Sequence, residues 1–213
     1  MFPSKTHPER LADGIVHAVS LIGFVVAGGF LLHAAFTLEH GALHIAVLIY
    51  MAAVLFSIGM SFAYHLLPRH DLRPLLRKWD HAAIYPVIAA TFSPLLIIVG
   101  TWSAHLILAA VWGFAIIGVG FKLLGSNLDS RWSLVSYLGL GWFALLALPD
   151  FWMGLPRFST YAVAGGGIFY TIGTAFYRRK EMRYRYPIWH TFGTLGGFSF
   201  FAGIYAAVIA STA

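Results

Sequence analysis

The chain has 213 residues, of which 59% are hydrophobic and only 10% are charged, and it contains no cysteine. A soluble globular protein has about a quarter of its residues charged, so this composition is typical of an integral membrane protein. Without cysteine, disulfides, thiolate metal sites and a cysteine nucleophile are excluded. The formal net charge of +6 does not indicate nucleic acid, because the cations lie in short loops where anionic lipid headgroups attract them. We therefore expect membrane lipids, and no nucleic acid, as partners.

Seven apolar stretches follow one another, and each is about long enough to cross a ~30 Å hydrocarbon layer as a helix. They cover residues 12–36, 42–66, 80–100, 103–124, 132–149, 159–177 and 187–210. The segments between them are short, the longest being 67–79 and 150–158. The sequence thus predicts an all-α bundle of seven transmembrane helices that forms a single domain over residues 1–213. It predicts no particular oligomeric state.

The residues before the first stretch indicate where its helix begins. Thr6 and Glu9, with Pro8 between them, have the spacing of a capping box. The apolar run that follows is too long for a signal peptide and lacks an A-x-A cleavage site. We expect this first span to be retained.

The Lys and Arg residues are distributed unevenly between the loops. Thirteen of the fourteen lie in the amino-terminal segment and in or beside every second loop, and only Arg157 lies in the alternate loops. Cytoplasmic loops of membrane proteins carry the excess of Lys and Arg. The sequence therefore predicts a cytoplasmic amino terminus and a carboxyl terminus outside.

Several polar side chains lie inside the predicted spans, near the same end of the bundle. They are His17, Ser61, His65, Asp80, His81 and His190. At about 1.5 Å rise per residue, all of them lie within about 10 Å of the predicted cytoplasmic boundary. Each ionisable group costs free energy at that depth and needs a partner. We expect these side chains to converge.

Metal binding is one way to satisfy such a cluster. Ser61 and His65 are four residues apart and share a helical face, whereas Asp80 and His81 are neighbours that point about 100° apart. A catalytic zinc site takes three protein ligands, commonly histidines, and a water. Asp80 can orient a ligand, hold the water or bind the metal itself. The alternative is a set of polar residues at helix ends that bond to one another and to headgroups without a metal.

Four motifs in chain order resemble one family. They are Glu9-Arg-Leu-Ala-Asp13-Gly-Ile-Val-His17, Ser61-Phe-Ala-Tyr64-His65, Asp80-His81-Ala-Ala-Ile-Tyr-Pro-Val-Ile-Ala-Ala-Thr-Phe-Ser-Pro94 and Ile188-Trp189-His190-Thr-Phe192. They are similar to motifs of the bacterial hemolysin III proteins, which belong with the progestin and adipoQ receptor superfamily. The resemblance covers the whole chain and agrees with the predicted topology.

The resemblance implies a zinc ion near the cytoplasmic face, held by one histidine of the second span and two of the seventh. Carried over by position, His65 and His190 are ligands, and Asp80 and Ser61 are the supporting catalytic groups. Animal relatives look like hydrolases of ceramide-like lipid amides. Bacterial members are associated with membrane-lipid homeostasis in the plasma membrane, and the hemolysin name implies lytic activity. No organic cofactor is expected.

One position departs from the family. The seventh-span motif is H-x-x-x-H, and here Tyr186 stands in place of the first histidine. A phenol with a pKa near 10 is a poor zinc ligand at neutral pH. Asp80 can complete the site, or His17 or His81 can do so, or the metal is weakly held or lost.

Two classes of function follow from these alternatives. With zinc bound, water is activated at the metal, Asp80 transfers protons, and a lipid amide or ester is hydrolysed, as in a ceramidase-like enzyme. The alternative is a non-catalytic regulator or receptor-like membrane protein with a structural or vestigial metal site. A membrane-lytic pore is a third class, although the spans carry no line of charges through the outer half.

Overall fold

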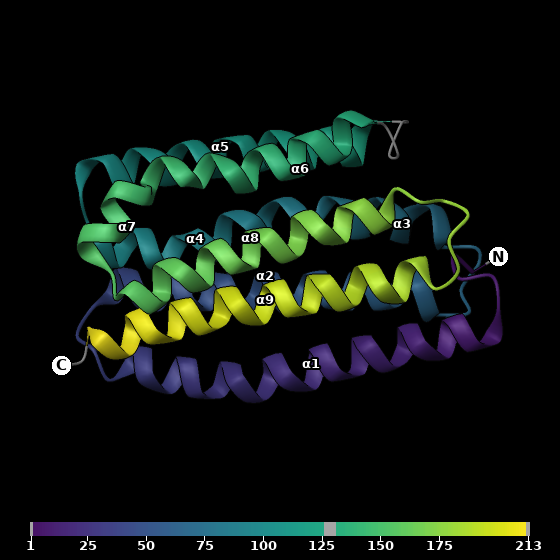
Figure 1. Ribbon diagram of the computed structural model, residues 1–213, viewed down its shortest axis with the longest axis horizontal. Coiled ribbons are helices and arrows are strands. Elements are labelled where there is room, and N and C mark those ends of the chain that lie inside the picture. The colour runs from purple at the N-terminus through teal and green to yellow at the C-terminus, as the bar shows by residue number, and fades with distance from the viewer. Residues whose placement is uncertain (1, 126–130, 212–213) are drawn as a thin grey trace.

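The computed structural model describes residues 2–125 and 131–211, which form an elongated bundle of helices (Figure 1). The helices are α1 (His7–Phe36), α2 (Gly41–Leu66), α3 (Arg73–Ala82), α4 (Ile84–Val99), α5 (Trp102–Leu124), α6 (Arg131–Phe143), η1 (Ala144–Ala147), α7 (Leu148–Gly154), α8 (Arg157–Tyr177) and α9 (Arg185–Ala210). No strand occurs within these two ranges. The prediction of an all-α fold is confirmed.

Six helical segments in the described part of the chain are long and apolar enough to cross a membrane. They are α1, α2, α3 with α4, α5, α6 through α7, and α9. Helix α8 has 21 residues, but its glycines, threonines and tyrosines make it less apolar than these six. It nevertheless lies inside the bundle, packed along α9 (Figure 1).

Two predicted spans differ from the observed helices. A helix already begins at Arg73, inside the predicted loop 67–79, because Pro74 suits the first turn of a helix and the polar residues after it form an amphipathic turn. The stretch 132–149 is broken, since α6 ends at Phe143 and a 3₁₀ turn leads into α7. Hydropathy does not predict the start of α3, because its residues are mostly polar. It does not predict the break after Phe143 either, because the apolar run continues through it.

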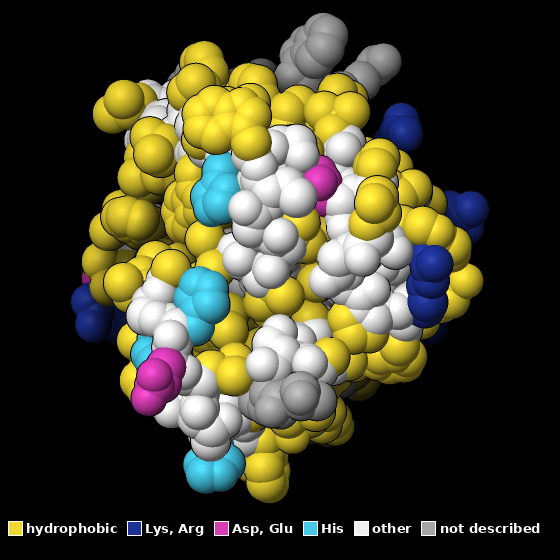
Figure 2. All heavy atoms as spheres, turned by 90° about the vertical axis from the view of Figure 1, so that its left-hand side faces the viewer, with side chains coloured by type: hydrophobic (Ala, Val, Ile, Leu, Met, Phe, Trp, Pro, Cys, Tyr) yellow, Lys and Arg dark blue, Asp and Glu magenta, His cyan; other side chains and the backbone are white. Residues whose placement is uncertain are grey.

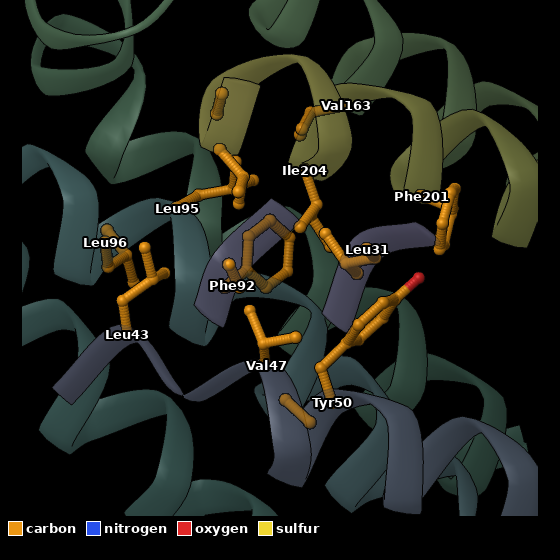
Figure 3. Close-up of a cluster of buried hydrophobic side chains, with 14 of the residues drawn as sticks. Leu31, Leu43, Val47, Tyr50, Phe92, Leu95, Leu96, Val163, Phe201 and Ile204 are labelled. Carbon is orange, nitrogen blue, oxygen red and sulfur yellow. The ribbon is translucent and has the colours of Figure 1, made fainter. Parts of the chain in front are cut away.

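The buried core lies where α1, α2, α4, α8 and α9 meet (Figure 3). Leu31, Val47 and Ile204 are completely buried there, and Phe92 packs among them. Large apolar side chains also cover the outside of the bundle: Ile116 is 67% exposed and Phe121 is 74% exposed. A soluble monomer rarely exposes contiguous apolar surface on this scale, so the surface is suited to lipid.

The end face that contains the carboxyl terminus shows hydrophobic side chains with a few histidine and acidic groups (Figure 2).

The starts of α1 and α9 are held together by Glu9. Thr6 is the N-cap of α1, and Thr6 and Glu9 form the predicted capping box, which is confirmed. The other oxygen of Glu9 accepts a hydrogen bond from the Tyr184 N–H at 3.0 Å, immediately before α9 begins. This contact joins the starts of α1 and α9 at one end of the bundle, which we call the amino-terminal end (Figure 1). The chain begins at this end and finishes at the opposite one.

Helices α8 and α9 approach each other closely through glycines. A Cβ atom on Gly203 would lie 3.0 Å from the main-chain oxygen of Ser159. A Cβ on Gly196 would lie 2.6 Å from the ring of Tyr170. Small residues allow such close contact between membrane helices, where dispersion and hydrogen bonds replace the hydrophobic effect as the source of association.

We predict that Gly203→Leu destabilises the bundle by about 1–3 kcal/mol, because the new side chain overpacks the α8–α9 contact. The matched control is Gly113→Leu, on the lipid-facing side of α5, where an added Cβ meets no atom within 4 Å. Thermal unfolding in detergent, followed by circular dichroism, compares the two variants. An equal loss of stability in both would contradict the close-packing argument.

Candidate metal centre

The candidate site is built around Asp13, whose side chain is completely buried. Asp13 lies on α1, one turn after Glu9. Its Oδ1 atom is 2.6 Å from Nδ1 of His190 on α9, and its Oδ2 atom is 3.2 Å from Nδ1 of His65 on α2. Three helices thus contribute one side chain each to a single point at the amino-terminal end.

These three side chains fit a divalent metal. One donor atom from each of Asp13, His65 and His190 lies within 4.8 Å of the other two. Bonds of about 2.0–2.1 Å in a tetrahedral arrangement put donor atoms about 3.3 Å apart, so only small shifts are needed. Two imidazoles and one carboxylate form a known catalytic zinc set.

A polar atom left without a partner distinguishes this arrangement from a plain ion pair. An ion pair between His190 and Asp13 would satisfy both of those groups without a metal. Nδ1 of His65, however, is buried and makes no hydrogen bond with any part of the described chain. Its contact with Asp13 at 3.2 Å is close enough for charge attraction but not aligned as a hydrogen bond. Buried polar atoms are rarely left unpaired, so this nitrogen fits the role of a metal ligand.

His17 and Ser61 lie directly beside the three donors. Nδ1 of His17 is 2.8 Å from the main-chain oxygen of Asp13, and Nε2 is 3.0 Å from Oγ of Ser61. The same Ser61 oxygen is 3.4 Å from Nε2 of His190. These contacts connect α1, α2 and α9 in a second layer around the donors.

The remaining predicted residues lie nearby but outside the group of three. Asp80 contacts its neighbour His81 at 3.4 Å, and Nδ1 of His81 is 2.9 Å from the main-chain oxygen of Arg77. The ring of Tyr186 packs against the ring of His65, with 4.7 Å between centroids. The predicted third ligands were Asp80, His17 and His81, whereas the group of converging donor atoms in the structure contains Asp13 beside His65 and His190.

Sequence reasoning missed Asp13. It lies at the edge of the first apolar stretch, where an aspartate is unremarkable at a membrane boundary. The available signal was its spacing, four residues after Glu9 and four before His17, on one face of α1. All three of these residues are buried in the structure. The choice of ligands remains a prediction.

An apolar cavity of about 270 Å³ adjoins the candidate site. His65, His190 and Asp80 line the cavity near the amino-terminal end. Farther along, its walls are mostly apolar, and it reaches Phe151 on α7, near the opposite end. The lining includes Phe24, Tyr50, Val54, Ile88, Phe92 and Val163. A cavity with a polar head and an apolar body suits an amphiphile that contains a hydrocarbon chain.

Residues 2–6, the amino-terminal segment, fold back over the site. Ser4 is buried, and its hydroxyl donates a hydrogen bond of 3.4 Å to Oδ2 of Asp13. The ring of Phe2 lies 5.0 Å from the guanidinium groups of both Arg10 and Arg73. Cation–π contacts of this kind hold the segment against the start of α1 and the start of α3.

Comparison with known proteins agrees with the motifs. The haemolysin-III related family matches residues 6–201. The "Hemolysin-3 homolog" of Bacillus subtilis (strain 168) is 30% identical over 196 residues, which cover 90% of each chain. The "Hemolysin-3" of Bacillus cereus is 28% identical over 196 residues, covering 89% of this chain and 86% of that protein. The six apolar segments together with these relatives make the protein an integral membrane protein. The chain belongs to the haemolysin III family, within the progestin and adipoQ receptor superfamily.

Proposed function

We propose that this protein is a zinc-dependent hydrolase of the bacterial plasma membrane that cleaves the amide or ester bond of a membrane lipid. In this role it serves membrane-lipid homeostasis. The observation that carries the proposal is the convergence of Asp13, His65 and His190 beside an apolar cavity. A donor set of this kind at one end of an apolar cavity suits hydrolysis of an amphiphile better than simple structural support.

The donor set favours zinc among the divalent metals. Imidazole nitrogens suit zinc, copper, iron and nickel, whereas calcium and magnesium favour oxygen ligands. Three protein ligands would leave one coordination position for water or substrate, and His65 and His190 also line the cavity. When bound, zinc would supply Lewis acidity that activates water near neutral pH.

Asp80 is the residue to which we assign proton transfer. It lines the same cavity as His65 and His190 without belonging to the donor group. A carboxylate in that position can accept a proton from the attacking water and return it to the leaving amine or alcohol. Tyr186 also lines the cavity, and its hydroxyl can donate a hydrogen bond to the developing oxyanion.

The topology that we propose has seven spans in one domain over residues 1–213, with the amino terminus in the cytoplasm. Helix α8 supplies the seventh span, since it is 21 residues long and packs inside the bundle beside α9. The two chain ends lie at opposite ends of the bundle, as an odd number of crossings requires (Figure 1). The Lys and Arg count supports the orientation.

A second function, a regulator whose metal is structural, is favoured by one observation. The three donors come from three different helices, and two of them, Asp13 and His65, have side chains that are only 0% and 3% exposed. A metal there would fix α1, α2 and α9 relative to one another. Metal content alone does not separate the two functions, whereas product release does. The name of the Bacillus cereus relative suggests lysis, but the apolar body of the cavity does not suit an ion pathway.

The orientation can be tested without background labelling, because the chain has no native cysteine. We predict that Ser211→Cys reacts with a membrane-impermeant thiol reagent in spheroplasts. Asp71→Cys should react only after the membrane is permeabilised. The reverse pattern would overturn the orientation and the cytoplasmic position of the site.

Metal content tests the ligand set. We predict about one zinc per chain by elemental analysis of protein purified without chelator. Asp13→Ala, His65→Ala and His190→Ala should each remove most of the metal. His105→Ala is the control, since that ring bonds to Thr101 near the start of α5, away from the donor group. Wild-type protein free of transition metal would refute the zinc proposal.

The role of Asp80 is tested by hydrolysis. Asp80→Asn should retain zinc and lower the release of fatty acid from a ceramide-like or phospholipid substrate by about 100-fold or more, because proton transfer is lost. Mass spectrometry of the products measures the rate. Asp150→Asn is the matched control, at a partly exposed carboxylate near the opposite end that accepts hydrogen bonds from Thr101 and Ser103. If Asp80→Asn loses zinc while Asp13→Asn keeps it, Asp80 is the ligand.

A further inference from the structure

Asp13 differs from the other two donors in how it is covered. Its side chain is 0% exposed, and within the described part of the chain it is not among the residues that line the cavity, whereas His65 and His190 are. A hydrated ion enters apolar surroundings only at a large cost in free energy, so we expect it to reach the donors from the nearest aqueous phase, beyond the amino-terminal end. What covers Asp13 at that end therefore controls access to the site.

The amino-terminal segment provides this cover. Ser4 is only 3% exposed, although its neighbours Lys5 and Thr6 are exposed. The Ser4 hydroxyl donates its hydrogen bond to Oδ2 of Asp13, the oxygen that lies 3.2 Å from Nδ1 of His65. Ser4 therefore lies against the carboxylate at the point where Asp13 and His65 face each other.

The two ends of the segment are held by contacts of different strength. At its carboxyl end, Thr6 is fixed as the N-cap of α1 by reciprocal hydrogen bonds with Glu9. At its other end, the ring of Phe2 is held by its cation–π contacts with Arg10 and Arg73. Such contacts are individually weak at partly exposed sites, and the segment belongs to no helix. It can therefore move away from the bundle without unfolding a helix.

Arg73 relates the closed position of the segment to a helix that carries a donor. Its guanidinium donates hydrogen bonds to the main-chain oxygens of Tyr64 and Leu67 at the end of α2, beside His65. Phe2 thus packs on a group whose position is set by the end of α2. The segment closes against α1 and α2, two of the three helices that carry the donors.

We propose that the amino-terminal segment is a lid over the candidate metal centre, with Phe2 as its latch and the Thr6 cap as its hinge. When the lid is closed, Ser4 keeps water away from Asp13. When it is open, the metal ion and the water that the reaction consumes can enter. The inference rests on the proposed metal site and adds a means of controlling access to it.

The first test needs no metal, because the chain has no native cysteine and position 4 can carry the reporter. Ser4→Cys, in the full chain in detergent with chelator, should react slowly with N-ethylmaleimide, since this position is buried when the lid is closed. Adding Phe2→Ala should speed the reaction by about 5–30-fold, the effect of losing two cation–π contacts. Arg10→Gln should also speed it, since Arg10 contacts Phe2 and donates a hydrogen bond to the Lys5 carbonyl. Phe2→Tyr should keep the slow rate, because an aromatic ring is retained.

Two controls show whether the rate reports the lid. Lys5→Cys, at the exposed neighbouring position, should react fast with either Phe or Ala at position 2. Phe36→Ala removes an exposed ring at the other end of α1, where it stacks on His44, and should leave the Ser4→Cys rate unchanged. The proposal is overturned if Ser4→Cys reacts as fast as Lys5→Cys, or if Phe2→Ala has no effect.

The second test is zinc release. When zinc-loaded protein is mixed with excess chelator, Phe2→Ala should lose zinc faster than wild type, by a factor similar to that found for labelling. Its zinc stoichiometry at saturation should be unchanged, since Phe2 is not a ligand. Faster labelling with unchanged zinc release would mean that the segment moves without controlling access, which would overturn the proposal. If wild type binds no zinc but Ser4→Cys behaves as predicted, the proposed function fails and the lid over Asp13 stands.

Discussion

A carboxylate removed from water organises one end of this molecule. A buried ionised group is tolerated only where partners replace its hydration, and Asp13 has no exposed surface at all. Its partners cannot all come from one helix, so α2 and α9 must bring His65 and His190 to the same depth. The Glu9 contact with Tyr184 acts one turn earlier and fixes the depth at which α9 begins. The alignment of α1, α2 and α9 at this end and the candidate site are therefore consequences of one constraint.

Polar and apolar side chains are distributed unevenly along the cavity, so that the groups able to catalyse a reaction lie at one end and the groups able to bind a hydrocarbon chain lie beyond them. The residues able to hold a metal or move a proton gather near the starts of α1 and α9, and the cavity beyond them is apolar. An amphiphile has the same asymmetry, with a polar linkage at one end of a hydrocarbon chain. When its hydrocarbon chain lies in this cavity, such a molecule places its scissile bond at the polar end. The apolar walls then do not need to recognise its headgroup. This arrangement favours selection of substrates by the shape of their hydrocarbon chain over selection by the charge of their headgroup.

The sequence predicted the parts of the fold that hydropathy and helical spacing encode. Apolar stretches gave the long helices, and the four-residue spacing of Ser61 and His65 gave the face on which both are found. Hydropathy could not reveal α3, whose residues Arg73–Ala82 are mostly polar, nor the break after Phe143, which lies within a continuous apolar run. Asp13 escaped notice for a related reason. Its importance comes from the contacts that His65 on α2 and His190 on α9 make with it. The spacing along α1 shows which of its residues share a face but not which helices lie opposite that face.

The position of Ser4 and Phe2 affects how the protein can be handled. The amino-terminal segment is part of the wall of the site, because the Ser4 hydroxyl contacts the carboxylate of Asp13. A polyhistidine tag fused ahead of Phe2 would thus put a second set of imidazoles within reach of the group, where they would compete for the same ion and disturb the packing of Phe2 against Arg10 and Arg73. The carboxyl terminus is at the far end of the bundle (Figure 1), so an affinity handle placed there leaves the metal stoichiometry interpretable.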